Sequence, residues 1–412
     1  MVEQWLLESG EHRPPSVPEG SDIAATLETV KTNPMGSPDV DTIRAALTSG
    51  DIRAAYGGLK CLQQLQDHHP DLLNELDNEF LQTFQQFENP FVLGQVAELL
   101  NRQSEIEGDT EDLIIEFGEL IDPQLPVRIR APILRMLARG IEDNWMKFSA
   151  IESPVRESLT SSYPSVQAPA LEILATVVDQ GSTYDVGNYA EEVMMAVHVD
   201  DEAVQEPALR LLTRLLFEHP DVGRELFDRV TDLMNAESPA VRRWAIQSGY
   251  GIGMENPDLL ASVAPNFVSV LVGDDEEVRE RLNSAFPDSP VTQFASRPVT
   301  NAIFWDGDVI DRIEPDRIVE WFGEEHVGSR AGIEPMILLA EIANRDPENV
   351  APVGPLLESA LTSGRAQRGR PLEDTAFLLG RLATSSPDLV DGVIESHLEA
   401  LGEPGVDDEL IV

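Results

Sequence analysis

Arginine side chains recur at regular intervals in this chain, and they are its strongest candidates for ligand binding. Arg102 and Arg139 are 37 positions apart, and Arg214 follows 75 positions after Arg139. A guanidinium group stays charged at physiological pH and donates up to five hydrogen bonds, which suits it to carboxylate and phosphate groups. If each arginine lies on an equivalent helix, the spacing predicts a stripe of anion-binding side chains.

Acidic residues near these arginines leave a second interpretation open. Glu105 and Glu142 follow their arginines by three positions, and Glu218 follows Arg214 by four. Residues at these spacings are neighbours on a helix surface and can form ion pairs. Either the arginines face a partner, or they are neutralised within their own helices.

A second row of charged positions lies about one helical turn before the first row. Its members alternate in sign at the same spacing: Glu98, Arg135, Glu172 and Arg210. Opposite charges on adjacent helices attract each other, so the alternation predicts a ladder of ion pairs between successive helices. We interpret this row as structural.

The other residue types offer no catalytic or cofactor site. The seven histidines are scattered, and none forms a His-Glu-x-x-His helix or a zinc-binding spacing with Cys61. The Gly-Tyr-Gly-Ile-Gly segment at 249–253 is interpreted as close helix packing followed by a helix end, because no strand precedes it. With 74 carboxylates, no acid–base pair stands out. We therefore expect no catalytic residue, no metal and no cofactor.

Two further clusters are candidate contact points. Phe304 and Trp305 fall in a stretch expected to be a loop, so they are either a binding tip or a plug in the side of the fold. The other cluster is basic and consists of Arg365, Arg368 and Arg370. It is either a solvated loop or a second binding spot.

The elements that carry these residues repeat along the chain. One position recurs at steps of 37 or 38 residues: Gln95, Pro132, Pro169, Pro207, Trp244 and Arg281. Apolar residues around it follow helical spacing, and we expect the prolines to lie within about the first turn of each helix. A period of this length predicts an all-α chain of stacked helix pairs.

The turns between the expected helices resemble HEAT repeats, in which an acidic turn precedes a Val-Arg pair. The clearest stretches are 237–245, which reads Glu-Ser-Pro-Ala-Val-Arg-Arg-Trp-Ala, and 274–279, which reads Asp-Asp-Glu-Glu-Val-Arg. Two more pairs carry isoleucine in place of valine: Ile52-Arg53 and Ile129-Arg130. The resemblance covers roughly residues 39–286, and less closely 306–401. It implies a right-handed α-solenoid, in which the outward side of the second helices lines a concave surface.

Two repeats depart from this pattern and weaken any expectation of an unbroken Asp-Arg ladder. They read Val166-Gln167 and Val204-Gln205. HEAT arrays mostly serve as scaffolds for other macromolecules, and a few related arrays act on bilins or damaged DNA. The resemblance therefore implies a fold and leaves the activity open.

The repeat pattern divides the chain into five parts. They are a partly disordered leader at 1–38, the repeat array at 39–286, an insertion at 287–330, further helical repeats at 331–401 and an acidic tail at 402–412. The insertion lengthens one step of the repeat, and we expect it to be irregular around 287–305. Pro287, Pro290 and Pro298 are the reason, because proline disfavours a helix interior.

The composition indicates where such a chain works. The 412 residues carry a net charge of −45, from 74 acidic and 29 basic residues, and only Lys31, Lys60 and Lys147 are lysines. An acid-rich, lysine-poor chain with 42% hydrophobic residues is typical of folded cytoplasmic proteins in halophilic archaea. The sequence predicts neither a signal peptide nor a membrane span.

These observations favour a non-catalytic scaffold or adaptor that binds a protein partner on the concave face. A HEAT-like enzyme of the DNA-alkylation-repair or bilin-lyase type is one alternative, and a nucleic-acid-associated architectural factor is another. Nucleic acid is the less favoured partner, because the net charge opposes binding to phosphates. The sequence does not specify the oligomeric state.

Overall fold

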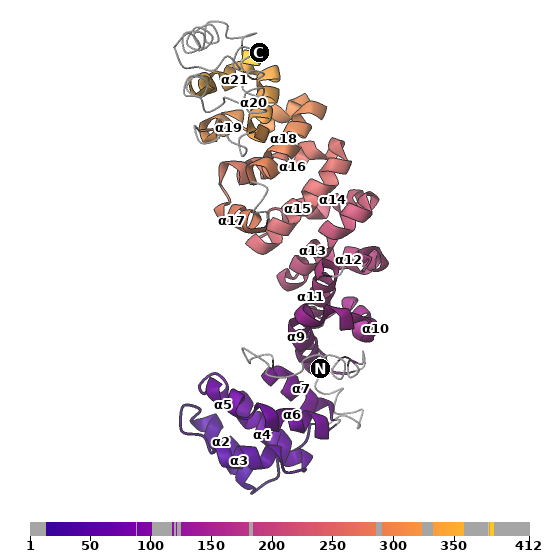
Figure 1. The fold of residues 1–412 in the computed structure, drawn as a ribbon, viewed down its shortest axis with the longest axis vertical. Coiled ribbons are helices and arrows are strands. Elements are labelled where there is room, and N and C mark those ends of the chain that lie inside the picture. The colour runs from indigo at the N-terminus through magenta and orange to yellow at the C-terminus, as the bar shows by residue number, and fades with distance from the viewer. Residues whose placement is uncertain are drawn as a thin grey trace, which may run out of the picture. The chain divides into compact units, whose positions relative to one another are not determined.

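The computed structural model describes residues 14–87, 89–100, 118, 121, 125–180, 184–285, 291–323, 333–357, 378 and 380–382. Within these ranges every regular element is a helix (Figure 1). The chain divides into two compact units, Met1–Leu211 and Leu212–Val412, and the boundary in the sequence falls within helix α13. Over the same described residues, no helix is both long and apolar enough to cross a membrane.

The first unit contains helices α2 to α12 and most of α13. Their bounds are α2 Asp22–Thr32, α3 Val40–Leu47, α4 Ile52–Leu65, α5 Pro70–Glu75, α6 Asp77–Gln86, α7 Pro90–Leu100, α9 Val127–Asn144, α10 Phe148–Leu159, α11 Pro164–Gln180, α12 Ala190–Val197 and α13 Glu202–Glu218. Two short 3-10 helices, η1 Trp145–Lys147 and η2 Val186–Tyr189, precede α10 and α12.

The second unit continues from the end of α13. Its helices are η3 Pro220–Val222, α14 Gly223–Leu233, α15 Pro239–Glu255, α16 Pro257–Val272, α17 Glu276–Ala285, α18 Val291–Trp305, η4 Gly307–Arg312, α19 Pro315–Trp321, α20 Ile333–Arg345, α21 Pro347–Val350 and η6 Ala351–Val353.

Helices pack mainly against helices that are close to them in the chain, often with one or two helices in between. In the first unit α4 contacts α7, α7 contacts α9 and α9 contacts α11, while the shorter helices pair as α3 with α6 and α10 with α12. In the second unit α15 contacts α17, α16 contacts α18, and α18 contacts α20. The expectation of an all-helical chain built from helix pairs is confirmed, and the arrangement is compatible with a helical repeat.

One apolar position is buried in helix after helix. It is occupied by Ile129 in α9, Val166 in α11, Val204 in α13, Val241 in α15 and Val278 in α17, and each of these side chains is at most 2% exposed. Burying a β-branched side chain of this size contributes about 1.5–3 kcal/mol. The 37- or 38-residue spacing seen in the sequence is therefore the spacing of one buried core position in successive repeats of the pattern.

Acidic turns start several of these helices. The side chains of Asp51, Asp201 and Asp275 accept hydrogen bonds of 2.9–3.2 Å from the backbone N–H groups of Arg53, Ala203 and Val278. Such a cap satisfies one of the N–H groups that have no partner inside the helix, and it typically stabilises the helix by about 1 kcal/mol.

Prolines lie deeper in the helices than the sequence predicts. Pro132, Pro169 and Pro207 are each the sixth residue of their helices, beyond the first turn. Pro298 lies inside α18, so the irregular stretch expected around 287–305 is wrong for 291–305. A proline inside a helix removes one helical hydrogen bond at a cost of about 3 kcal/mol. Burial of one face of α18 offsets this cost. The nearly inaccessible side chains on that face are Val291, Ala295, Val299, Ala302 and Ile303.

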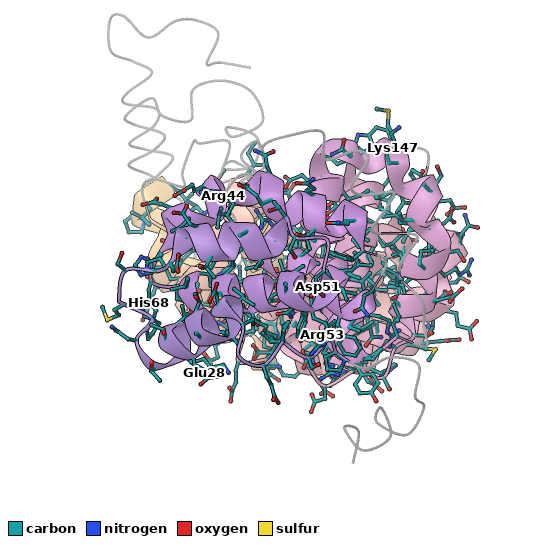
Figure 2. The ribbon with its side chains drawn as sticks, turned by 90° about the horizontal axis from the view of Figure 1, so that it is seen from below. Glu28, Arg44, Asp51, Arg53, His68 and Lys147 are labelled. Carbon is teal, nitrogen blue, oxygen red and sulfur yellow. The ribbon has the colours of Figure 1, made fainter. Side chains whose placement is uncertain are left out.

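The part of the expected leader that the structure describes includes helix α2, which packs on α3 and α4. Helix α2 contacts α4, and the Ser21 hydroxyl caps α2 by accepting from the Ala24 N–H. Arg53 Nε donates to the Ser16 carbonyl oxygen at 2.9 Å, and Figure 2 labels Arg53 at the surface of this unit. Residues 1–13 lie outside the described range.

Candidate functional site

A hollow of about 760 Å³ lies over α7, α9, α11 and α13 in the first unit. It is lined by Glu98, Arg135, Ala138, Arg139, Glu142, Glu172, Thr176, Glu206, Pro207 and Arg210. We call this surface the charged hollow. It contains the whole alternating row predicted from the sequence, together with Arg139 and its equivalent Thr176.

Helical spacing brings these residues to one surface. On α9, Ala138 and Arg139 follow Arg135 by three and four positions, and Glu142 follows them by four and three, so the four residues share a face. The opposite face of α9 is buried through Ile133, Leu134, Leu137 and Ile141. The packing of α9 on α7 and α11 therefore turns its charged side toward the hollow.

The first rung of the predicted ladder is confirmed. Arg135 Nη2 donates to Glu98 Oε2 at 2.8 Å, joining α9 to α7 across 37 residues. The Arg135 side chain is 47% exposed and that of Glu98 is 20% exposed. A pair of this exposure contributes about 0.2–1 kcal/mol, so it orients the two side chains more than it stabilises the fold.

The last rung of the ladder is wrong. Arg210 Nε donates to Asp179 Oδ2 at 2.8 Å instead of pairing with Glu172. Both carboxylates belong to α11, and Asp179 lies seven residues after Glu172, which is two turns along the same face. The charge of Arg210 acts on Glu172, but Arg210 forms its ion pair with Asp179, which is nearer the end of α11.

Glu172 occupies an unfavourable electrostatic position, although its side chain is exposed. Loss of hydration beside the neighbouring helices raises the pKa of Glu172, and the nearby carboxylate of Glu206 raises it further. The charge of Arg210 opposes both effects without reversing them. Relative to its protonated form, the ionised form of Glu172 is therefore less stable in the hollow than in water.

Negative charge exceeds positive charge in the charged hollow. Its lining carries four glutamates and three arginines, and Asp179 adds a fifth carboxylate through its bond to Arg210. Five carboxylates against three guanidinium groups leave two negative charges. The surface therefore does not offer an excess of positive charge to an anionic ligand.

The predicted arginine stripe is only partly visible. Arg139 is exposed and lines the charged hollow, whereas Arg214 is exposed on the part of α13 that belongs to the second unit. The remaining predicted arginines, Arg102, Arg365, Arg368 and Arg370, lie outside the described residues. The stripe therefore stays a prediction.

Phe304 and Trp305 end helix α18 and do not lie in a loop, so that expectation was wrong. Their side chains are 65% and 64% exposed, and their rings meet edge to face with centroids 6.0 Å apart. At this exposure they do not plug the side of the fold.

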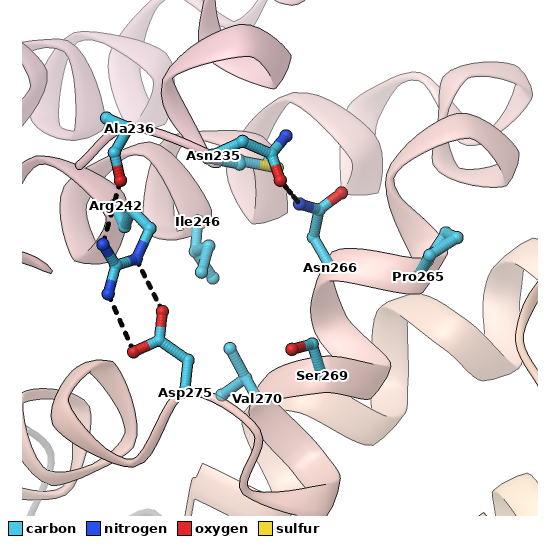
Figure 3. Close-up of a pocket in the computed structure, with 10 residues that line it drawn as sticks. Asn235, Ala236, Arg242, Ile246, Pro265, Asn266, Ser269, Val270 and Asp275 are labelled. Atoms are coloured by element: carbon cyan, nitrogen blue, oxygen red, sulfur yellow. Dashed lines mark hydrogen bonds and ion pairs between the residues drawn. The ribbon is translucent and has the colours of Figure 1, made fainter. Parts of the chain in front are cut away.

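A second hollow, which the sequence did not reveal, lies in the second unit. It measures about 440 Å³ and is lined by Met234, Asn235, Ala236, Arg242, Ile246, Pro265, Asn266, Ser269, Val270 and Asp275 (Figure 3). We call it the amide cleft, because Asn266 Nδ2 donates to Asn235 Oδ1 at 3.2 Å across it. The Val-Arg motif marks Arg242, but nothing in the sequence marks the two asparagines.

Arg242 forms the polar wall of the amide cleft. Its Nε and Nη2 donate to the two carboxylate oxygens of Asp275 at 2.6 and 3.0 Å, and its Nη1 donates to the carbonyl oxygens of Ala236 and Glu237. Burial alone would raise the pKa of Asp275, but hydrogen bonds from Arg242 and Val278 and the Arg242 charge outweigh it and lower that pKa. The two charges cancel, so this cleft is electrically neutral.

The two hollows differ in charge but resemble each other in the kinds of polar groups that line them. Their polar groups are carboxylates, guanidinium groups, amides and hydroxyls, and neither lining contains a histidine or a cysteine. Both hollows are open surfaces formed by adjacent helices.

Comparisons with known proteins bear on the fold. No family model matches the chain, and no curated protein matches it. An engineered protein whose crystal structure was determined by the Northeast Structural Genomics Consortium is similar, with a TM-score of 0.54 and 16% sequence identity. The likeness covers 91% of this chain and 96% of that chain. At this identity it concerns the fold alone.

Proposed function

We propose that this chain is a non-catalytic scaffold that binds a protein partner through the charged hollow. One observation carries the proposal: a single open surface collects charged side chains from four helices, α7, α9, α11 and α13. Surfaces assembled from equivalent positions of successive helices suit an extended partner, which can contact several repeats at once.

We further propose that the chain is a HEAT-like, right-handed solenoid. The support is the position of bonds between neighbouring helix pairs. Arg135–Glu98, Tyr189–Glu152 and Arg156–Glu192 in the first unit join residues 36 or 37 positions apart. In the second unit Thr213–Ser248 and Arg242–Asp275 join residues 35 and 33 apart.

The composition supports a cytoplasmic, halophilic setting as part of this proposal. At about 1 M salt the screening length falls to about 3 Å, so a net charge of −45 does not prevent close contacts. The same salt removes most of the counterion-release gain that drives binding to nucleic acid. A protein partner held by direct contacts is therefore favoured over nucleic acid.

The test is affinity capture of the tagged protein from its native-salt lysate, with the hollow blocked by a bulky residue. Ala138 lies between Arg135 and Arg139 on α9, and Ala138→Trp fills the hollow without changing its charge. Ala150→Trp is the matched control, because Ala150 is exposed and lies on α10, which contributes no residue to the lining of the hollow. Circular dichroism establishes that both variants are folded.

We expect a stoichiometric protein that survives nuclease treatment to be captured by the parent and by Ala150→Trp, and to be lost with Ala138→Trp. Capture that is equal for all three proteins would place the partner elsewhere and overturn the proposal. Capture that disappears on nuclease treatment would instead identify a nucleic-acid-associated factor.

A further inference from the structure

Two arginines of the charged hollow already have carboxylate partners. Arg135 bonds to Glu98, and Arg210 bonds to Asp179. An incoming anion would have to displace one of these carboxylates, and it would meet the surplus negative charge of the lining. The charged hollow is therefore poorly suited to the anionic ligands that its arginines suggest from sequence alone.

Two carboxylates on adjacent helices have no such partner. Within the described residues, Glu172 on α11 and Glu206 on α13 form neither a hydrogen bond nor an ion pair through their side chains. The two groups interact repulsively, because Glu206 raises the pKa of Glu172. Because both glutamates line the same hollow, a positive charge that enters it would relieve this repulsion and form charge-assisted hydrogen bonds with them.

The surroundings limit what can carry that positive charge. Thr176 and Pro207 contribute small, partly apolar surface next to the two glutamates, and Ala138 contributes the same on α9. An open hollow of about 760 Å³ admits a side chain with an apolar stem and a charged end. Lysine and arginine have this construction, since their methylene stems cover apolar surface while the charged group reaches carboxylates.

We propose that the charged hollow accepts a lysine or arginine side chain of the protein partner, and that Glu172 and Glu206 hold its charged group. The occupant is thus a basic segment of another protein, chosen by charge complementarity with a hollow whose lining has an excess of carboxylates, two of them without a hydrogen-bond or ion-pair partner among the described residues. This inference rests on the proposed scaffold function and names the chemistry of its partner.

The probe is a fluorescein-labelled twelve-residue peptide of alternating lysine and alanine, with a glutamate–alanine peptide of equal length for comparison. Fluorescence anisotropy measures the Kd of each peptide for the full chain, at the lowest salt concentration at which circular dichroism shows the parent folded. We expect the lysine peptide to bind and the glutamate peptide not to bind.

Two substitutions with opposite expected signs locate the binding. Glu172→Gln with Glu206→Gln removes both carboxylates and should weaken binding of the lysine peptide by about tenfold or more, because two charge-assisted contacts are lost. Arg210→Gln removes the competing cation and should strengthen binding by about two- to threefold. If the hollow instead binds anions through its arginines, the glutamate peptide should bind. Its binding should then be strengthened by the double glutamate substitution and weakened by Arg210→Gln.

A matched control separates the hollow from the general charge of the chain. Glu225→Gln with Asp228→Asn also removes two exposed carboxylates, but from α14 in the second unit. This variant should change the Kd by less than about twofold. Equal weakening by both double variants would show non-specific attraction to an acidic protein and would overturn the inference.

The inference and the proposed function fail in different ways. If Ala138→Trp loses the captured partner while Glu172→Gln with Glu206→Gln affects neither that partner nor the lysine peptide, the scaffold function stands and the cationic contact is wrong. If Ala138→Trp keeps the captured partner, the hollow is not the docking surface and the function itself is wrong.

Discussion

Arg242 and Asp275, which are 33 residues apart in the sequence, form a bidentate ion pair that joins the starts of α15 and α17. Arg242 near the start of α15 also holds the carbonyl oxygens of Ala236 and Glu237, while Asp275 caps α17 through the Val278 N–H. One guanidinium group therefore bonds both to the turn that precedes α15 and to the turn that precedes α17. Both side chains are about four-fifths buried, at 20% and 22% exposure.

Asp275→Asn should destabilise the second unit by about 1–3 kcal/mol, because it leaves a partly buried guanidinium group without its counter-charge. Asp258→Asn is the control, since it breaks the Arg224–Asp258 pair, whose side chains are 57% and 61% exposed. That variant should lose less than about 1 kcal/mol. Urea denaturation followed by circular dichroism gives both values, and equal losses would show that the Arg242 pair has no special role.

The same pair predicts a pH dependence with a definite sign. The pKa of Asp275 is lower in the folded chain than in the unfolded chain, where it is about 3.9. Its contribution is therefore fully present above about pH 4 and is lost as the pH falls through the folded pKa. The urea midpoints of the parent and Asp275→Asn should converge at low pH, and a constant gap between them down to pH 2 would contradict this origin.

Gln167→Leu should destabilise the first unit by about 1–3 kcal/mol, because it strands a buried carbonyl group. Gln167 is 4% exposed, and its Nε2 donates to the Leu159 carbonyl oxygen at 2.8 Å. Gln180→Leu on the same helix is the control, because Gln180 is exposed. Thermal unfolding of both variants tests the difference, and a loss as small as that of the control would mean that Gln167 does not fasten the turn.

Gln167 also shows what the sequence pattern did not predict about these turns. The departures from Val-Arg argued only against an unbroken Asp-Arg ladder, and Gln167 and Gln205 bond to carbonyl oxygens of the preceding turn as Arg242 does. A glutamine supplies an N–H donor without a charge. It can therefore form the hydrogen bond to the preceding turn, but it cannot form the ion pair that Arg242 makes with Asp275. The repeat period and the buried valine position were readable from the sequence because both depend on local spacing.

The charged hollow was predictable only as a set of positions. Helical periodicity placed Arg135 and Glu98 in register, and they pair as expected. Periodicity does not decide between two carboxylates on one face, so Arg210 pairs with Asp179 and not with Glu172. The helical state of 291–305 was missed for a related reason: the cost of Pro298 is local, whereas the burial that offsets it comes from neighbouring helices.

Two glycines of α15 should respond oppositely to substitution by alanine. At Gly253 a Cβ atom would lie 2.1 Å from Leu260 Cδ2, so Gly253→Ala should overpack the core and cost about 1–3 kcal/mol. At Gly251 the nearest atom is Leu216 Cβ at 3.7 Å, so Gly251→Ala should gain up to about 1 kcal/mol from helix propensity. Melting temperatures that fell for both variants would contradict the different packing of these two positions.

Cys61 should be nearly unreactive in the folded chain. The side chain is inaccessible, and burial raises the pKa of its thiol to about 12, with a small opposing effect from Lys31. Because the thiolate is the reactive form, only about one thiol in ten thousand is ionised at pH 8, against roughly a quarter for an unfolded thiol with a pKa of about 8.5. Reaction with Ellman's reagent at pH 8 should therefore be slow without denaturant and complete within minutes in urea. Rapid reaction of the native protein, at the rate of a small free thiol, would show that α4 opens readily or that Cys61 is not buried.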